Sequence, residues 1–121
     1  MSTVFRPLGP TKLITANTAG VQGNIVSTGA MTTTYLKIDN VNNANVDAFV
    51  NFGTANTTAA TIANATTTGN SIVVQHNDTI YVATASGFNQ NPATKLYVAA
   101  ITASGTANVY ITPVAIISTG N

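Results

Sequence analysis

Short runs of β-branched and aromatic residues, separated by clusters of Gly, Asn, Ser and Thr, recur along the whole chain. Apolar and polar residues alternate within several runs, as in TYLKID, where Leu36 and Ile38 point one way and Lys37 and Asp39 the other. A period of two with one polar face is the pattern of an antiparallel strand that covers a core. Threonine is abundant and β-branched, which favours strand over helix. These features predict an all-β fold.

The spacing of the runs predicts eight strands within one domain of 121 residues. This count favours an antiparallel β-sandwich or a barrel-like, jelly-roll-like fold. The run AIIS at 115–118 can add a short last strand, and residues 53–70 are best interpreted as a long loop with one edge strand. The eight predicted strands are 13–16, 21–27, 34–39, 47–52, 71–75, 79–83, 96–101 and 108–112.

The best-defined segment is the closing stretch YVAAITASGTANVYITP. Its apolar runs at 96–101 and 109–111 flank TASGTAN, which predicts one β-hairpin with a turn of small residues. Pro113 has no backbone N–H, so we expect it to end the ladder. The stretch contains no acid, base, histidine or cysteine, which indicates a structural role.

The two ends of the chain are predicted to differ from the domain between them. Residues 1–10 should form an extended N-terminal arm, because Pro7, Gly9 and Pro10 disfavour both helix and central strand. Residues 11–121 then form a single β-domain that ends in a short apolar tail at 116–121. Phe5 and Arg6 give the arm side chains that can dock on a neighbouring molecule.

Charged residues make up only 6% of the chain, against about 25% in an ordinary soluble domain, and the net charge is +1. Four scattered Lys and Arg residues do not form the basic cluster that nucleic acid or an anionic membrane requires, so we expect neither partner. Neutral faces repel copies of themselves poorly, which favours a subunit of an assembly over a soluble monomer. The chain has no cysteine and no recognisable secretion signal, so we expect synthesis in the cytoplasm.

The ionisable side chains form no recognisable catalytic pattern. His76 and Asp78 lie in QHND without a serine in a nucleophile context, so a turn is the better interpretation. Asp39 and Asp47 flank the NVNNAN loop and are the one candidate pair for a hard cation or for glycoside hydrolysis. Turn-forming Asn and Asp side chains explain this loop better. We predict no enzyme activity, no catalytic residue, no metal site and no cofactor.

Two stretches, YLKIDNVNNANVDAFVNFGT and YVAAITASGTANVYITP, resemble a group of small all-β accessory virion proteins of tailed bacteriophages. The resemblance rests on a strand that ends in Asn, a strand of the type xFVxFG and the closing string, at 35–40, 48–53 and 97–113. The sequence departs from the pattern at Val114, where a glycine is expected, and at Asn51, where a basic residue is common. The resemblance implies a structural protein, most often a capsid decoration or cement protein of the head, and no enzyme.

The resemblance also implies partners and a location. The partners are the major capsid protein and copies of this chain, in a homo-oligomer for which a trimer is the candidate state, on the outer capsid surface of the virion. Two alternatives stay open: a phage tail, adaptor or fibre component, and a carbohydrate-binding β-module that uses exposed tyrosines. From their positions in the arm and the tail, the candidate contact residues are Val4, Phe5, Arg6, Pro7, Leu8, Ile116 and Ile117.

Overall fold

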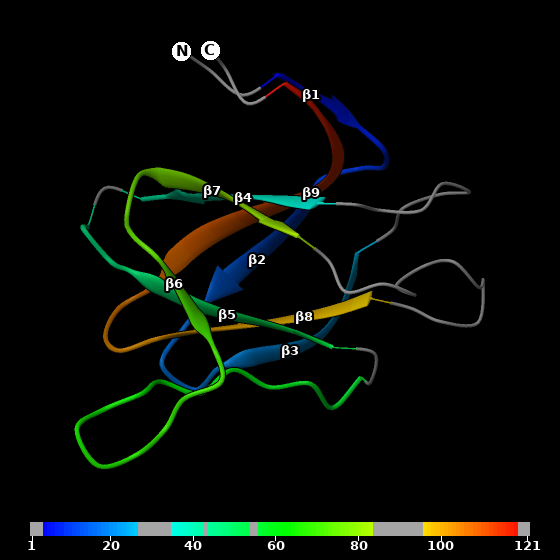
Figure 1. Cartoon of the computed structure of the whole chain (residues 1–121). Coiled ribbons are helices and arrows are strands. Elements are labelled where there is room, and N and C mark those ends of the chain that lie inside the picture. The colour runs from blue at the N-terminus through cyan, green and yellow to red at the C-terminus, as the bar shows by residue number, and fades with distance from the viewer. Residues whose placement is uncertain (1–3, 27–34, 43, 54–55, 84–95, 119–121) are drawn as a thin grey trace.

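The computed structural model describes residues 4–26, 35–42, 44–53, 56–83 and 96–118. These residues contain nine strands and no helix, arranged as two antiparallel sheets packed into a β-sandwich (Figure 1), which confirms the predicted all-β fold. All predicted strands except the last agree with the structure within two residues at each end, and residues 27 and 34 lie outside the described part. The strands are β1 (Val4–Pro7), β2 (Lys12–Ala16), β3 (Val21–Val26), β4 (Tyr35–Val41), β5 (Ala48–Gly53), β6 (Ile72–Val74), β7 (Asp78–Ala83), β8 (Leu96–Thr102) and β9 (Ala107–Ser118).

The strand order is that of a jelly roll. Sheet A has the order β1-β9-β4-β7, with β2 also paired to β9, and sheet B has the order β3-β8-β5-β6. Each consecutive pair β2–β3, β4–β5, β6–β7 and β8–β9 places one strand in each sheet, so the chain crosses the sandwich at every one of these connections. This alternation between a five-stranded and a four-stranded layer is how a jelly roll closes its core.

The predicted hairpin at the end of the chain is wrong, because β8 and β9 belong to different sheets. β8 pairs with β3 and β5, whereas β9 pairs with β1, β2 and β4. The turn between them has Gly105 at φ 71°, and the Thr102 hydroxyl donates to the Gly105 carbonyl at 2.6 Å. Such a turn of small residues can return a strand to its neighbour or to the opposite sheet, so the local pattern is the same for both.

Pro113 does not end the ladder either, since β9 continues through it to Ser118 and places it opposite Leu36 of β4. On its other side β9 pairs first with β2 and then with β1, and Pro113 lies where the partner changes. Its carbonyl faces that side, because it accepts a hydrogen bond from the Leu8 N–H at 2.8 Å. The N and O of one residue in an antiparallel strand point the same way. The missing N–H therefore faces the gap between β2 and β1, where β9 loses no ladder bond.

The core lies between the two sheets and follows the predicted alternation. Leu36 and Ile38 of β4 are fully buried, as are Val109 and Ile111 of β9, which lie in the same layer of sheet A. Their neighbours along each strand face outward and are more exposed. The inward residues from both sheets that form the core cluster are Ile14, Ala16, Leu36, Ile38, Ala48, Val50, Val74, Leu96, Val98, Ala100, Ala107, Val109 and Ile111.

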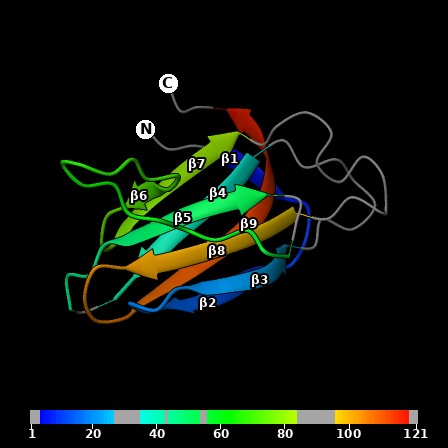
Figure 2. The ribbon, with the colours of Figure 1, turned by 90° about the horizontal axis from the view of Figure 1, so that it is seen from below.

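Residues 56–71 form a long excursion that crosses the outer face of sheet B (Figure 2). The Asn51 amide of β5 donates to the Ala59 carbonyl at 2.9 Å, which ties the excursion to the sheet. Ala99 points outward from β8 yet is only 1% exposed. The predicted long loop is confirmed, but the edge strand expected within it does not form among residues 56–70. Asn and Thr side chains supply the hydrogen bonds that a strand partner would supply.

Residues Val4–Pro7 of the expected extended arm pair with the end of β9 as strand β1 of sheet A. The expected tail is likewise continuous with β9, which runs to Ser118. An extended segment leaves its backbone N–H and C=O groups free to pair, and the end of β9 offers partners for them. Residues 1–3 and 119–121 of the predicted arm and tail lie outside the described residues.

Candidate functional site

A buried asparagine organises the end of the sandwich where β4 leaves sheet A. Asn40 is the third inward residue of β4 after Leu36 and Ile38, and it is 0% exposed. Its amide nitrogen donates to the Val46 carbonyl at 3.0 Å and to the Val74 carbonyl at 2.9 Å. A buried amide requires partners of this kind. Asn40 therefore links sheet A to the β4–β5 loop and to β6 of sheet B.

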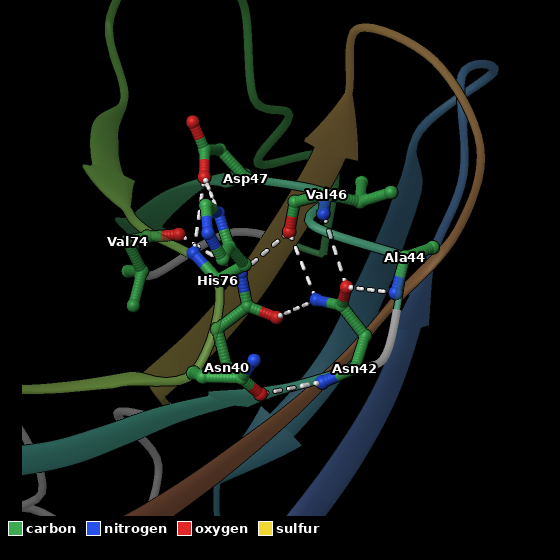
Figure 3. A network of polar contacts seen from close by, with 8 residues as sticks. Asn40, Asn42, Ala44, Val46, Asp47, Val74 and His76 are labelled. Atoms are coloured by element: carbon green, nitrogen blue, oxygen red, sulfur yellow. Dashed lines mark hydrogen bonds and ion pairs between the residues drawn. The ribbon is translucent and has the colours of Figure 1, made fainter.

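Asn42 continues this network into the β4–β5 loop (Figure 3). Its side-chain oxygen accepts from the backbone N–H groups of Ala44 at 3.1 Å and Val46 at 3.0 Å. Its nitrogen donates to the Asn40 side-chain oxygen and to the Val46 carbonyl, both at 2.9 Å. These bonds confirm that turn-forming asparagines shape the NVNNAN loop. They also fix the backbone of residues 44–46.

His76 and Asp47 form an exposed pair beside this network (Figure 3). One oxygen of the Asp47 carboxylate, Oδ1, receives the His76 backbone N–H at 3.0 Å and lies 2.9 Å from His76 Nδ1. The side-chain hydrogen bond from His76 is the main reason that the pKa of Asp47 lies below its ordinary value of 3.8. The pair joins the β6–β7 turn to the start of β5, at side-chain exposures of 41% and 43%.

The sequence associates His76 with Asp78, but the structure pairs it with Asp47, 29 residues earlier. Asp78 donates its backbone N–H to the Gln75 carbonyl at 3.2 Å, and Asn77 adopts φ 57°, which confirms the predicted turn. The structural role of Asn40 was not predicted from the sequence. Its position in step with two buried apolar residues, at 36 and 38, was the available signal.

Asp39 and Asp47, the candidate carboxylate pair, serve different partners. Asp39 forms an ion pair with Lys37 at 2.7 Å and accepts a hydrogen bond from the Thr79 hydroxyl on β7. Asp47 bonds to His76 on the other side of the loop. No group of three or more His and acidic side chains with metal-binding geometry occurs among the described residues.

A hollow of about 210 Å³ opens next to Asp47. The β4–β5 loop, strand β5 and the β8–β9 turn each contribute to its wall. A second hollow, of about 380 Å³, is lined mainly by small residues between the β2–β3 turn and the excursion, and none of the described residues that line it is charged. The first hollow is lined by Asn45, Val46, Asp47, Phe49, Ala103 and Ser104.

The structure brings the predicted contact residues together in one place. β1 pairs with residues 114–118 of β9, and we call this pair of strands the β1–β9 ribbon. Phe5 lies opposite Ile116, Arg6 opposite Ala115 and Pro7 opposite Val114. Two segments that are more than 100 residues apart in sequence thus form one surface.

An irregularity in the β1–β9 ribbon exposes an apolar side chain. Val4 lies opposite Ser118, whereas the next residue, Phe5, lies opposite Ile116, so Ile117 is the extra residue of a β-bulge. Bulges re-aim side chains at sheet edges. Ile117 is 61% exposed, which is the highest value among the large apolar residues described. Val4 is 50% exposed.

Phe5 points away from this exposed side and packs within the chain. β9 curves at its C-terminal end and carries β1 over the outer face of sheet A (Figure 1). The Phe5 ring lies 6.0 Å from the Tyr81 ring of β7, and Lys37 Nζ lies 5.4 Å from the Phe5 centroid. Val114 is fully buried here although it is not part of the main core cluster. Phe5, one of the predicted contact residues, therefore already packs against other residues of the domain.

Comparisons with protein families, with characterised proteins and with solved structures found no match to this chain. The described residues also contain no helix long and apolar enough to cross a membrane.

The two surfaces differ in what they can do chemically. The β1–β9 ribbon offers exposed apolar groups and one cation, Arg6, which suits contact with another protein surface. The hollow beside Asp47 offers a carboxylate, an amide, a hydroxyl and an aromatic ring, which suits a small polar ligand. The polar network of Asn40 and Asn42 holds the second surface in shape.

Proposed function

We propose that this chain is a structural virion protein of a tailed bacteriophage, a capsid decoration or cement protein that binds the major capsid protein lattice and stabilises the head. The observation that carries the proposal is the pairing of β1 with the end of β9, which gathers the candidate contact residues into one ribbon. Val4 and Ile117 stand exposed on it, and removing such apolar groups from water favours association.

The composition supports the same proposal. With 6% charged residues and a net charge of +1, the surface carries little electrostatic repulsion between copies. Many copies on a fixed lattice can each bind weakly and still occupy it, because the lattice holds the contacts at high local concentration. A small ribbon with two exposed apolar side chains is adequate for a contact of that kind.

The two stretches that resemble accessory virion proteins fall on the four central strands of the sandwich. The first spans β4 and β5, and the second spans most of β8 and β9 as far as Pro113. The resemblance therefore involves the inner strands of both sheets, which determine the shape of a jelly roll. Jelly rolls occur in viral capsid proteins and in lectins alike, so the function has to be tested at its own surface.

Immunogold electron microscopy of purified phage particles, with antibody against this domain, tests the location. Gold spread over the heads is the expected result. Gold confined to the tails would replace the proposal with a tail or adaptor role. An absence of gold, together with absence of the protein from mass spectra of the particles, would overturn the virion assignment.

A binding assay on particles that lack the protein tests the ribbon itself. We expect the double variant Val4→Thr, Ile117→Thr to need about tenfold more protein to saturate the particles, because two apolar side chains lose their buried contacts. Val41→Thr is the matched control, since Val41 is 52% exposed on β4 and lies outside the ribbon. Equal saturation by the double variant and the control would exclude the ribbon as the contact surface.

A further inference from the structure

The hollow beside Asp47 has the chemistry of a ligand site that the proposed particle contact does not use. We propose that it binds one neutral monosaccharide ring, such as the terminal residue of a glycan. Its lining residues include Asp47, Asn45 and Ser104, whose side chains carry a carboxylate, an amide and a hydroxyl, and the aromatic residue Phe49. Sites for small ligands characteristically combine apolar and aromatic walls with a few placed polar groups.

The Asp47 carboxylate is held in a defined orientation. Both hydrogen bonds from His76 reach the same oxygen, Oδ1. The other oxygen points away from His76 (Figure 3). A carboxylate oxygen fixed in this way can accept hydroxyl groups, and hydrogen bonds to an ionised acceptor are roughly twice as strong as neutral ones.

The backbone around the hollow is also fixed before any ligand arrives. Asn42 bonds the backbone of Ala44 and Val46, and Asn40 bonds the Val46 carbonyl from the core. On the opposite side the β8–β9 turn packs closely, since a Cβ added at Gly105 would lie 3.2 Å from a Val46 methyl group. A site built in advance saves a ligand the free-energy cost of ordering it.

The lining discriminates between classes of ligand. Calcium takes six to eight oxygen ligands, including carboxylates, and Asp47 is the one carboxylate among the residues that line the hollow. An anion would face that carboxylate, whose neighbour His76 is already engaged with it. A wholly apolar ligand would leave the Asp47, Asn45 and Ser104 groups without partners, which carries a desolvation cost.

A sugar ring satisfies both parts of the lining. Its hydroxyl groups can donate to Asp47 and exchange hydrogen bonds with Asn45 and Ser104, while its C–H face can lie on the Phe49 ring, whose face carries partial negative charge. Phe49 is half-buried between Val73 and Ile101, its direct neighbours on β6 and β8. The volume of about 210 Å³ is below the ~300–1,000 Å³ of pockets for larger ligands, which limits the site to about one ring.

The test is a titration of the full chain, labelled with ¹⁵N, with glucose, galactose, mannose and N-acetylglucosamine, followed by amide chemical-shift mapping. We expect at least one sugar to cause saturable shifts centred on residues 45–49 and 103–104. Asp47→Asn should lower the affinity for that sugar by about tenfold, because it replaces a charged acceptor with a neutral one while keeping the shape of the side chain. Asp78→Asn, in the adjacent turn and outside the hollow, should leave the affinity unchanged.

A second variant guards against loss of fold in Asp47→Asn. Asn45 adopts φ 57°, a conformation that glycine accepts freely, so Asn45→Gly removes the amide and leaves the turn intact. Asn45→Gly should also lower the affinity for the sugar. Four outcomes overturn the proposal: no sugar causes shifts, the shifts map to the tyrosines of sheet A, both variants bind as the unaltered chain does, or Asp78→Asn weakens binding equally. None of these outcomes bears on particle binding through the ribbon.

Discussion

The side-chain amide of Asn40 donates a hydrogen bond of 2.9 Å to the backbone carbonyl of Val74, from one sheet of the sandwich to the other. Both residues are 0% exposed. Beside a core cluster of aliphatic side chains, this bond specifies which end of β6 lies against β4. It also places the β4–β5 loop, because the same amide holds Val46.

Replacing Asn40 with leucine should lower the free energy of unfolding by about 2 kcal/mol, because the buried carbonyls it serves lose a donor. Asn108→Leu, on the exposed side of β9, removes only an exposed hydrogen bond from Thr15 and should lower it by less than about 1 kcal/mol. Urea denaturation of the three proteins measures the difference. Equal midpoints for Asn40→Leu and the unaltered chain would show that the inter-sheet bond contributes nothing.

The Asp47–His76 pair should make part of the stability depend on acid pH. The pKa of Asp47 is lowered in the folded protein by the hydrogen bond from His76, so the folded state favours the ionised form. This contribution is present above the ordinary value of 3.8 and is lost as the pH falls through the lowered value. Thermal melts from neutral to acid pH should therefore show a smaller decrease for Asp47→Asn than for the unaltered chain. Asp78→Asn provides the control, and an equally small decrease in that variant would contradict the assignment to Asp47.

The Phe5–Tyr81 contact should hold β1 against the sheet. We expect Phe5→Leu and Tyr81→Leu each to lower the free energy of unfolding by about 1 kcal/mol, which is the contribution of an aromatic pair beyond its buried area. The loss should be local, so hydrogen exchange should accelerate at residues 4–7 and 114–118 before it does in the core. Tyr81→Phe keeps the ring and should retain the protection. Uniform acceleration over all strands would mean that β1 does not open separately.

Gly69 should be required for the shape of the excursion on sheet B. A Cβ there would lie 2.4 Å from the backbone nitrogen of Ala63 and 2.8 Å from the Thr61 carbonyl, so Gly69→Ala must displace backbone. Limited proteolysis should cut residues 56–71 faster in this variant. Thr68→Ala, an exposed neighbour, should be cut at the rate of the unaltered chain. No change in Gly69→Ala would show that the excursion adjusts without opening.

Strand positions were predictable because alternation and turn residues are local properties of the sequence. Leu36, Ile38, Val109 and Ile111 face the core as their spacing indicates. The pairing of β8 and β9 was not predictable in the same way. A short turn such as that at Gly105 looks alike whether it closes a hairpin or carries the chain to the other sheet, and only long-range pairing decides between them.

The candidate site was predictable in part. The asparagine loop and the turn at His76 follow from local hydrogen bonding, and both are confirmed. The contact between Asp47 and His76 depends on how β5 and β6 align, and Phe5 reaches Tyr81 only because β9 curves. The role of Pro113 depended on which side of β9 its nitrogen faces, which no local pattern records.

The central position of β9 has a consequence for how the protein is made. β1, β2 and β4 all pair with this strand, so sheet A cannot close until residues 107–118 have left the ribosome. Until then β2 lacks its partner in sheet A and β4 can pair only with β7. Pairings this distant in sequence form slowly. Sheet A is thus completed only after β9 emerges, and the ribbon that we assign to particle contact is completed by the last residues of β9.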